Sequence, residues 1–226
     1  MRTPVRTDRA RRLAHGILIL SSAVLVTSCA SLGKKEQGAG IGAAAGAAVG
    51  AVIGHSTGST ARGAIIGAVV GGAAGAIIGH QMDQQAKEIR VDIPGATVER
   101  VGEGIAVTFA SGLLYDFDSD QVRSDAGVNL QQLATSLKKY PNTELLIVGN
   151  TDALGSTTYN QDLSQRRADA ASRYLMVQGV PMFRMRTAGR GELEPLQTND
   201  TEAGRQANRR IEVAIFANER TRATSP

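Results

Sequence analysis

The stretch LLIVGNTDALGSTTYNQDLSQRRADAASRYLMVQ, residues 145–178, decides the fold of this chain. It opens with four consecutive apolar residues at 145–148, a run typical of a strand buried on both faces. Residues 159–178 then follow a helical period, with one apolar face that contains Leu163, Ala170, Tyr174 and Val177. Gly179 stands where helices commonly end. A buried strand followed by an amphipathic helix predicts a sheet with helices packed on it.

The sequence on either side of this stretch supplies further strands and one more helix. Apolar alternation between turn residues predicts strands at 97–101, 105–109, 113–117, 184–189 and 210–216. A helix capped by Ser124 and stopped by Pro141 has an apolar face made of Leu130, Leu133, Ala134 and Leu137. These elements predict one globular domain at residues 95–218, of the α+β class, with a mixed sheet and helices packed on it.

The first 28 residues have the features of a signal peptide. Five arginines and a single acid precede a largely apolar run at 17–26, which is too short to span a membrane because a spanning helix needs about 20 residues. The run leads into Val26-Thr27-Ser28-Cys29, which resembles the lipobox of bacterial lipoproteins. The resemblance implies a covalent diacylglycerol and acyl chain on Cys29, with residues 29–37 as the lipidated N-terminus. The alternative is an ordinary signal followed by a free cysteine.

The charge of the predicted mature chain argues against nucleic acid as a partner. The signal holds 5 of the 25 basic residues and 1 of the 21 acids, so 20 of each remain after cleavage. Aromatic residues make up only 4% of the sequence. With no basic excess and few aromatic rings, the chain lacks the usual footprint of a nucleic-acid-binding protein.

Residues 38–79 form a repeat built almost wholly from Gly, Ala, Val and Ile. Glycines recur every fourth residue from 38 to 58 and again from 63 to 79, and a polar turn lies at 55–62. This spacing leaves a bare stripe on a helix, which allows close helix packing in lipid. The pattern resembles the glycine-zipper two-helix segment of envelope lipoproteins and predicts a membrane-associated helical hairpin. The alternative is a flexible linker.

The flanking segments have a different composition. Residues 80–94 are polar and charged and end at Pro94-Gly95, so we expect a linker between the hairpin and the globular domain. Residues 219–226 form a polar tail.

The residue types available in the globular domain limit its chemistry. The histidines lie at 15, 55 and 80, and the only cysteine is Cys29, so the domain contains neither residue type. This excludes a Ser-His-Asp triad, a Cys-His pair and a histidine-based zinc site there. Paired carboxylates could still hydrolyse a sugar chain, with Asp116, Asp118, Asp120 and Asp152 as candidates. We expect a binding protein rather than an enzyme, with no metal site and no cofactor besides the lipid on Cys29.

Short motifs between residues 117 and 217 occur together in an order and spacing that identify a family. They are Phe117-Asp-Ser-Asp120, Val148-Gly-Asn-Thr-Asp152, Gly155-Ser156, Tyr159-Asn160, Leu163-Ser-Gln-Arg-Arg167-Ala168, Gly189-Arg-Gly191-Glu192, Gly204-Arg205 and Asn208-Arg209-Arg210. Together they resemble the OmpA-like peptidoglycan-binding domain, which is shared with Pal-type lipoproteins. One departure is Asn150, where the family often has histidine.

The resemblance implies a ligand, the peptide stem of peptidoglycan, bound through meso-diaminopimelate. That residue carries an ammonium and a carboxylate on one carbon, so its site needs an anion close to a cation. By the family's pattern, Asp152 takes the ammonium and Arg167 binds the carboxylate through two parallel hydrogen bonds. The pattern adds Asn160, seven residues before Arg167 on one helix face, Asp120 as a polar contact, and Arg209 as a cation at the floor of the site.

Each of these residues also has a purely structural interpretation. Asp152 could cap the loop before the helix, and Arg167 could be a solvated residue beside Arg166. Arg209 has the strand parity of Ile211, so it could be a buried partner in an ion pair.

The sequence therefore predicts an outer-membrane lipoprotein with its domain in the periplasm. No acid follows Cys29 to favour the inner membrane. Its partners would be the outer membrane and peptidoglycan, which it would tie together without a covalent bond to the wall. In the rival hypothesis the glycine hairpin self-associates into a pore or scaffold, or the protein is an envelope assembly factor, and the domain only localises it.

Overall fold

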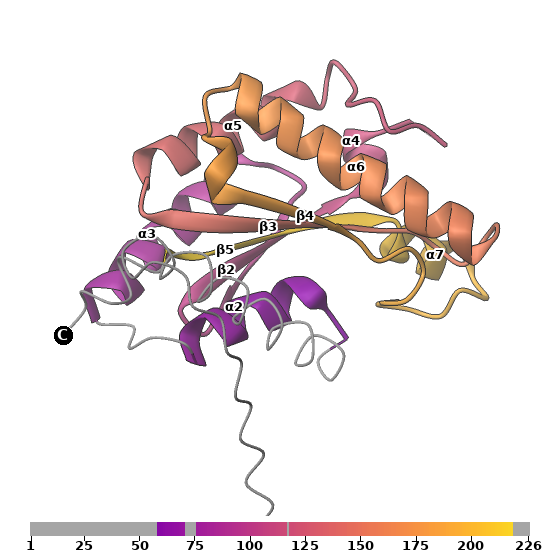
Figure 1. The fold of residues 1–226 in the computed structure, drawn as a ribbon, viewed down its shortest axis with the longest axis horizontal. Coiled ribbons are helices and arrows are strands. Elements are labelled where there is room, and N and C mark those ends of the chain that lie inside the picture. The colour runs from indigo at the N-terminus through magenta and orange to yellow at the C-terminus, as the bar shows by residue number, and fades with distance from the viewer. Residues whose placement is uncertain (1–57, 71–75, 117, 219–226) are drawn as a thin grey trace, which may run out of the picture. The chain divides into compact units, whose positions relative to one another are not determined.

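The computed structural model of the protein describes residues 58–70, 76–116 and 118–218. In this part of the chain five strands form one sheet with helices on both faces (Figure 1). Across the sheet the order is β1 (Thr97–Val101), β2 (Gly104–Ala110), β5 (Arg210–Ala217), β3 (Thr143–Asn150) and β4 (Met185–Gly189). Five of the six predicted strands are confirmed, and the one expected at 113–117 is not.

The sheet combines antiparallel and parallel pairs. The pairs β1–β2, β2–β5 and β5–β3 are antiparallel, whereas β3 and β4 are parallel. A parallel pair needs a crossover connection, which helix α6 (Thr157–Val177) and the 3-10 turn η1 (Met182–Arg184) provide. The predicted α+β class with a mixed sheet is therefore confirmed.

Helices α5 (Gly127–Lys139) and α6 cover one face of the sheet and lie above it in Figure 1. The largest hydrophobic cluster lies beneath them and includes Ile147 of β3 and Val213 of β5. The apolar face predicted for α5 is confirmed, since all four of its residues are buried: Leu130, Leu133, Ala134 and Leu137. This face supplies the main core of the domain.

Residues 80–94 are not a linker. Residues 80–92 belong to helix α3 (Ala76–Asp92), which contacts β1, β2 and α5. Its buried apolar side chains Met82, Ala86 and Ile89 enter the main core at helical spacing, and Ile93 follows them directly after the helix. The prediction of a polar connector is wrong because polar residues fill the exposed face of this helix and mask its apolar stripe.

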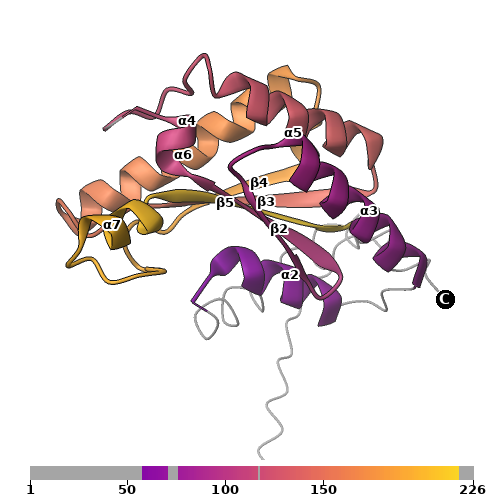
Figure 2. The same ribbon diagram turned by 180° about the vertical axis from the view of Figure 1, so that it is seen from behind.

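Helix α2 (Thr60–Val70) comes from the second half of the glycine repeat and covers the opposite face of the sheet (Figure 2). Ala61 and Ile65 are completely buried there, in a second hydrophobic cluster that contains the sheet residues Ala106, Val148 and Ala214. Ala61 and Ile65 thus pack against the domain, while the membrane association expected for the hairpin stays a prediction.

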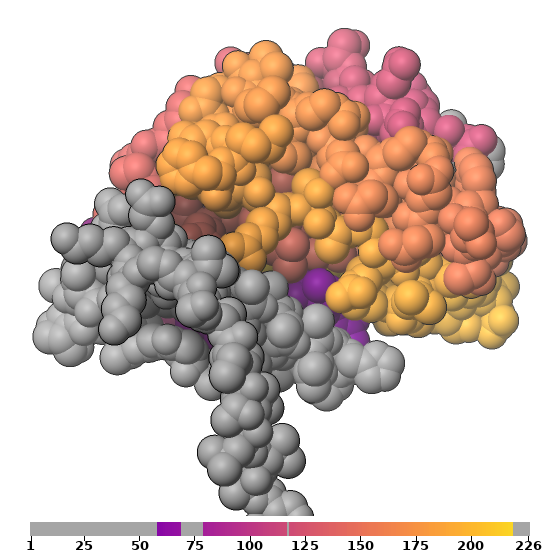
Figure 3. All heavy atoms as spheres, in the orientation of Figure 1, coloured from indigo at the N-terminus to yellow at the C-terminus, as the bar shows by residue number. Residues whose placement is uncertain are grey.

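The approach of α2 depends on a glycine in β2. A Cβ on Gly104 would clash with the side chain of Ile65 and with the backbone oxygen of Ile215. Figure 3 shows indigo atoms of α2 beside golden atoms of the segment that follows β4. Helix α2 therefore contacts both the sheet and a loop at its edge.

The helical hairpin predicted at 38–79 is described only in part. Helix α2 begins within the turn expected at 55–62, where Ser59 Oγ accepts the backbone N–H of Arg62 at 3.2 Å. None of the described helices is both long enough and apolar enough to cross a membrane. The first glycine helix, the signal peptide, Cys29 and the tail at 219–226 lie outside the described residues.

The strand predicted at 113–117 is wrong. After β2 the chain forms the short helix α4 (Ser111–Leu114), followed by a single bridge between Tyr115 and Val122. Leu114 and Tyr115 are adjacent and both fully buried. A strand with one core face would alternate the two side chains, so burying both requires a turn of the chain.

Two helix ends and one additional helix also differ from the prediction. Helix α5 begins after Ala126 without a side-chain cap, so Ser124 is not its cap. Val177, expected to face inward, is 76% exposed because it is the last residue of α6 and extends beyond the core. The short helix α7 (Glu202–Asn208), which the sequence did not predict, is capped by Thr201.

Candidate functional site

The site lies where β3 ends and α6 begins. A Cβ on Gly149 would clash with the backbone carbonyl of Ser164, so only glycine lets α6 lie this close to β3. Gly155 has a φ of +98°, and Ser156 caps α6 by accepting the N–H of Tyr159 at 3.2 Å. The connection is therefore short and places Asp152 close to the first turns of the helix.

A cavity of about 440 Å³ opens at this position, between the 151–155 loop, α4, α6 and α7. Four of the five predicted site residues line it: Asp152, Asn160, Arg167 and Arg209. They come from a loop, a helix and the residue before β5, so the fold brings together positions that are up to 57 residues apart in sequence.

Arg167 is the most unusual of these residues. It is only 5% exposed, and its guanidinium donates to the backbone oxygens of Ser119 at 2.8 Å and Asp116 at 3.5 Å. The ring of Tyr115 lies against it, 5.4 Å from ring centre to guanidinium carbon. Burial lowers the pKa of Arg167, although an arginine stays charged. Among the described residues no carboxylate forms an ion pair with it, so the interpretation as a solvated residue is wrong.

Tyr115 packs against Arg167. It is buried, and its hydroxyl donates to the backbone oxygen of Arg167 at 2.6 Å. Burial raises the pKa of Tyr115 far above its ordinary value, so the phenol stays neutral. The arginine therefore rests on a fixed, uncharged aromatic surface.

Asp152 is buried and forms an ion pair with Arg209. Its Oδ2 lies 2.5 Å from Arg209 Nη1, and its Oδ1 accepts the N–H of Leu154 at 3.0 Å. The latter bond is the loop-capping contact that the structural interpretation expected. Arg209 also contacts Glu202 at 2.6 Å. Burial opposes the charge of Arg209, but the hydrogen bonds to Glu202 and Asp152 raise its pKa overall.

The strand pattern allowed Arg209 to take part in a buried ion pair. The neighbouring residue, Arg210, forms that pair instead. Strand β5 begins at Arg210, which is 1% exposed and lies 2.6 Å from Glu212. Arg209 precedes the strand and lines the cavity. Asn208 holds this corner, because its side-chain oxygen accepts the N–H groups of Leu196 and Gln197.

Asn160 lies on the same buried face of α6 as Arg167. It is 2% exposed, and its Nδ2 donates to Glu192 Oε2 at 2.5 Å. The predicted pairing of positions 160 and 167 on one helix face is confirmed by their common position on the cavity wall.

Asp120 is the predicted residue that the structure does not bring into the cavity. Its carboxylate accepts from Arg166 at 3.0 Å, on the outer side of α6. Asp118 lines the cavity instead and accepts a hydrogen bond from the Tyr159 hydroxyl. The cause is local: Asp118 has a φ of +56°, which turns the loop between the two acids.

Two hydroxyls of the cavity were not predicted. Ser111 and Thr151 line it, and the hydroxyl oxygen of each is buried without a hydrogen-bond partner among the described residues. Buried polar groups are usually paired, so these two hydroxyls are exceptions. Ser111 lies outside every quoted motif, and Thr151 lies within Val148-Gly-Asn-Thr-Asp152 without being singled out there.

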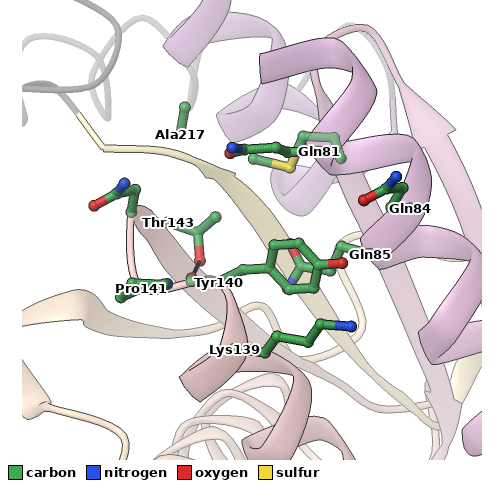
Figure 4. Close-up of a pocket in the computed structure, with 10 residues that line it drawn as sticks. Gln81, Gln84, Gln85, Lys139, Tyr140, Pro141, Thr143 and Ala217 are labelled. Atoms are coloured by element: carbon green, nitrogen blue, oxygen red, sulfur yellow. Dashed lines mark hydrogen bonds between the residues drawn. The ribbon is translucent and has the colours of Figure 1, made fainter. Parts of the chain in front are cut away.

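A second hollow of about 270 Å³ lies at the opposite end of β3 (Figure 4). Its lining includes Lys139 and Tyr140, which both contact Glu88 Oε1, at 2.5 and 3.1 Å. Its cation is therefore neutralised within the protein, unlike Arg167. The described residues contain no cluster of acids, histidines or cysteines able to hold a metal ion.

Two family models match the chain. Residues 114–209 match the OmpA family, and residues 11–83 match the YMGG-like Gly-zipper. The peptidoglycan-associated lipoprotein of Agrobacterium fabrum is 33% identical over 129 residues, which cover 57% of this chain and 73% of that protein. The chain belongs to the OmpA family. Both resemblances stated from the motifs are confirmed.

Relatives of this OmpA-family chain include outer membrane proteins and lipoproteins. The probable lipoprotein YiaD of Escherichia coli (strain K12) is 34% identical over 136 residues, or 59% of this chain and 62% of that protein. The chain thus spans less than two thirds of the length of the first curated relatives it matches.

Solved structures show the same fold. The cell wall anchor of the T6SS from Pseudomonas aeruginosa is 28% identical, with a TM-score of 0.52, and the match covers 60% of this chain and 96% of that one.

Proposed function

We propose that this protein binds peptidoglycan through the diaminopimelate of the stem peptide and tethers the outer membrane to the wall. One observation carries the proposal: the buried Arg167 pairs with no carboxylate of the described residues, in a cavity that also contains Asp152. A buried cation without a carboxylate partner is costly, so this cavity is suited to an anionic ligand. The names of the relatives support the wall as its source.

Both charges of the ligand have a complement in the cavity. Arg167 offers a guanidinium that can take a carboxylate through two hydrogen bonds. Asp152 already accepts two hydrogen bonds, but a carboxylate has about four acceptor positions, so it has room for an ammonium. The ligand is held by these contacts without any bond being broken, and we propose no catalytic step.

The membrane end of the tether rests on Cys29. Acyl chains on this residue would each contribute about 0.8 kcal/mol per buried methylene, and two or more chains make a stable anchor. The wall offers many stem peptides, so modest individual affinities multiply into a firm attachment. The rival pore hypothesis has less support, because part of the glycine repeat packs on the sheet as α2.

The test is cosedimentation of the full-length protein in detergent with insoluble peptidoglycan. Asp152→Ala and Arg167→Ala are compared with the wild type after circular dichroism has shown that each is folded. Lys139→Ala is the matched control, because it removes a cation that is already paired at the other end of β3.

We expect the wild type and Lys139→Ala to sediment with the wall and both site variants to stay in solution. Free diaminopimelate should release the wild type. If the folded wild type stays in solution, the proposal is wrong. If the site variants still sediment, another surface binds the wall.

A further inference from the structure

The loop between β4 and α7 reaches the proposed wall site through Glu192. Its Oε2 accepts from Asn160 Nδ2 at 2.5 Å, and its Oε1 accepts from the Thr157 hydroxyl at 2.8 Å. A carboxylate can only accept hydrogen bonds, so Glu192 must face the NH2 end of the Asn160 amide. That end therefore turns away from the cavity. Asn160 therefore presents its oxygen, an acceptor, to a ligand.

The backbone of the same loop is fastened to both elements of the site. The N–H of Thr151, directly after β3, donates to the oxygen of Gly191 at 2.8 Å. The N–H of Gly191 donates to Ser164 Oγ of α6 at 2.9 Å. Gly191 has a φ of +54° and packs against the backbone of Asn160 and Gln161. A shift of this loop would therefore move Glu192 relative to Asn160.

Two further residues of the loop bind the start of α2. Glu194 accepts from the backbone N–H of Thr60 at 2.9 Å and also from its hydroxyl. Arg190 donates to the Thr60 hydroxyl at 2.7 Å. A carboxylate at a helix N-terminus is favourable because it meets unpaired N–H groups. Residues 190–194 thus connect the wall site to the glycine-repeat helix.

The interface under the start of α2 is polar. Ser59 donates to Glu212 at 2.5 Å, which pairs with the buried Arg210. Beneath it, Arg210 Nη2 and both side-chain polar atoms of Asn150 have no partner among the described residues. These groups would regain water if α2 left the sheet. Of the α2 side chains that the structure describes, Ala61 and Ile65 enter a hydrophobic cluster, so docking of α2 can open locally while the main core stays folded.

The geometry points to residues 190–194 as a positioning element that couples docking of α2 to the affinity of the wall site. With α2 docked, Thr60 holds Glu194, the loop is fixed, and Glu192 orients Asn160 toward the ligand. By linkage, a bound ligand must stabilise the docked helix by the same factor. This inference rests on the proposed function, because it takes diaminopimelate as the ligand.

The experiment measures two quantities on the full-length protein in detergent. The first is the Kd for free meso-diaminopimelate, by calorimetry, for the wild type, Thr60→Val, Glu192→Leu and Glu192→Gln. The second is hydrogen exchange of the α2 amides with and without this ligand. Arg62→Ala is the control on α2, because its ion pair with Glu99 is exposed and does not touch the loop.

We expect the ligand to slow exchange in α2. Thr60→Val removes both hydrogen bonds of the Thr60 hydroxyl and should weaken binding about fivefold. Glu192→Leu should weaken it more, Glu192→Gln should restore part of the loss, and Arg62→Ala should stay within about twofold.

If the wild type binds but the ligand leaves α2 exchange unchanged, or Thr60→Val binds normally, the coupling is wrong and the proposed function stands. If the wild type does not bind the ligand at all, both the coupling and the proposed function are wrong.

Discussion

The two ends of strand β3 carry similar groups that differ in burial and in charge pairing. At the start of β3, Lys139 and Tyr140 share Glu88, and the charge of the lysine is cancelled within the protein. At its end, Arg167 lies against Tyr115 without a carboxylate partner among the described residues. Both ends have a cation, a tyrosine and a hollow.

The difference lies in burial and pairing. Glu88 and Lys139 are exposed enough for water to screen them, so their pairing contributes little. Arg167 is 5% exposed and its pKa is lowered by burial. A hollow alone therefore does not identify a binding site, whereas an unpaired buried charge beside an opposite charge does.

The largest expected effect comes from Arg167→Met. Loss of two charge-assisted hydrogen bonds should weaken diaminopimelate binding about 100-fold or more. The thermal midpoint should change little, because removal of a costly buried charge offsets the hydrogen bonds lost to the backbone oxygens of Ser119 and Asp116. Calorimetric titration and thermal unfolding measure the two effects. A large fall in the midpoint would show that Arg167 serves the fold, which would remove the contrast between the two ends.

The second prediction concerns the contact that assembles the site. Gly149→Ala places a methyl group against the backbone of Ser164, and overpacking of this kind costs about 1–3 kcal/mol. Chemical denaturation should show this loss, and affinity for diaminopimelate should fall as α6 moves from β3. Gly112→Ala is the control for stability alone, because Gly112 lines the cavity and its Cβ would meet only a flexible glutamine end at 3.6 Å. Unchanged stability for Gly149→Ala would contradict the close packing.

A smaller effect is expected at the other end of β3. Lys139→Ala removes an exposed ion pair, so the free energy of unfolding should fall by less than about 1 kcal/mol. Diaminopimelate affinity should not change. A loss of wall binding in this variant would mean that the second hollow also takes part.

The smallest effect is a pH dependence at Glu202. Hydrogen bonds from Arg209 and Arg205 lower the pKa of Glu202 below its ordinary value. A lowered pKa means that the stabilisation is present above about pH 4.3, the ordinary value of the group, and is lost as the pH falls through the folded-state value. Glu202→Gln should therefore lower the thermal midpoint slightly at pH 7 and not at pH 3. An equal difference at both pH values would contradict the ion pair.

Much of the fold could be predicted from the sequence. Strand β5 alternates Ile211, Val213 and Ile215 toward the main core, and this period is visible in the sequence. The helical spacing of Met82, Ala86, Ile89 and Ile93 was visible too, but the polar residues between them favoured a linker. The docking of α2 was not predictable, because glycine and alanine fit a lipid interface as well as a protein surface.

The candidate site could be predicted only through the family's motifs. Those motifs indicated Asp152, Asn160, Arg167 and Arg209, which line one cavity. They do not distinguish Asp118 from Asp120, since a positive φ at one residue decides which acid turns inward. The role of Glu192 depends on a contact across 32 residues, which no local pattern shows.

The central claim is that the cavity recognises an ammonium and a carboxylate on one carbon. The most direct measurement compares the affinities of the full-length protein for meso-diaminopimelate, cadaverine and pimelate. Cadaverine lacks both carboxylates and pimelate lacks both ammonium groups. The account predicts that diaminopimelate binds at least about tenfold more tightly than either, since each lost charged contact costs 1.5–3 kcal/mol. Equal binding of pimelate or cadaverine would contradict it.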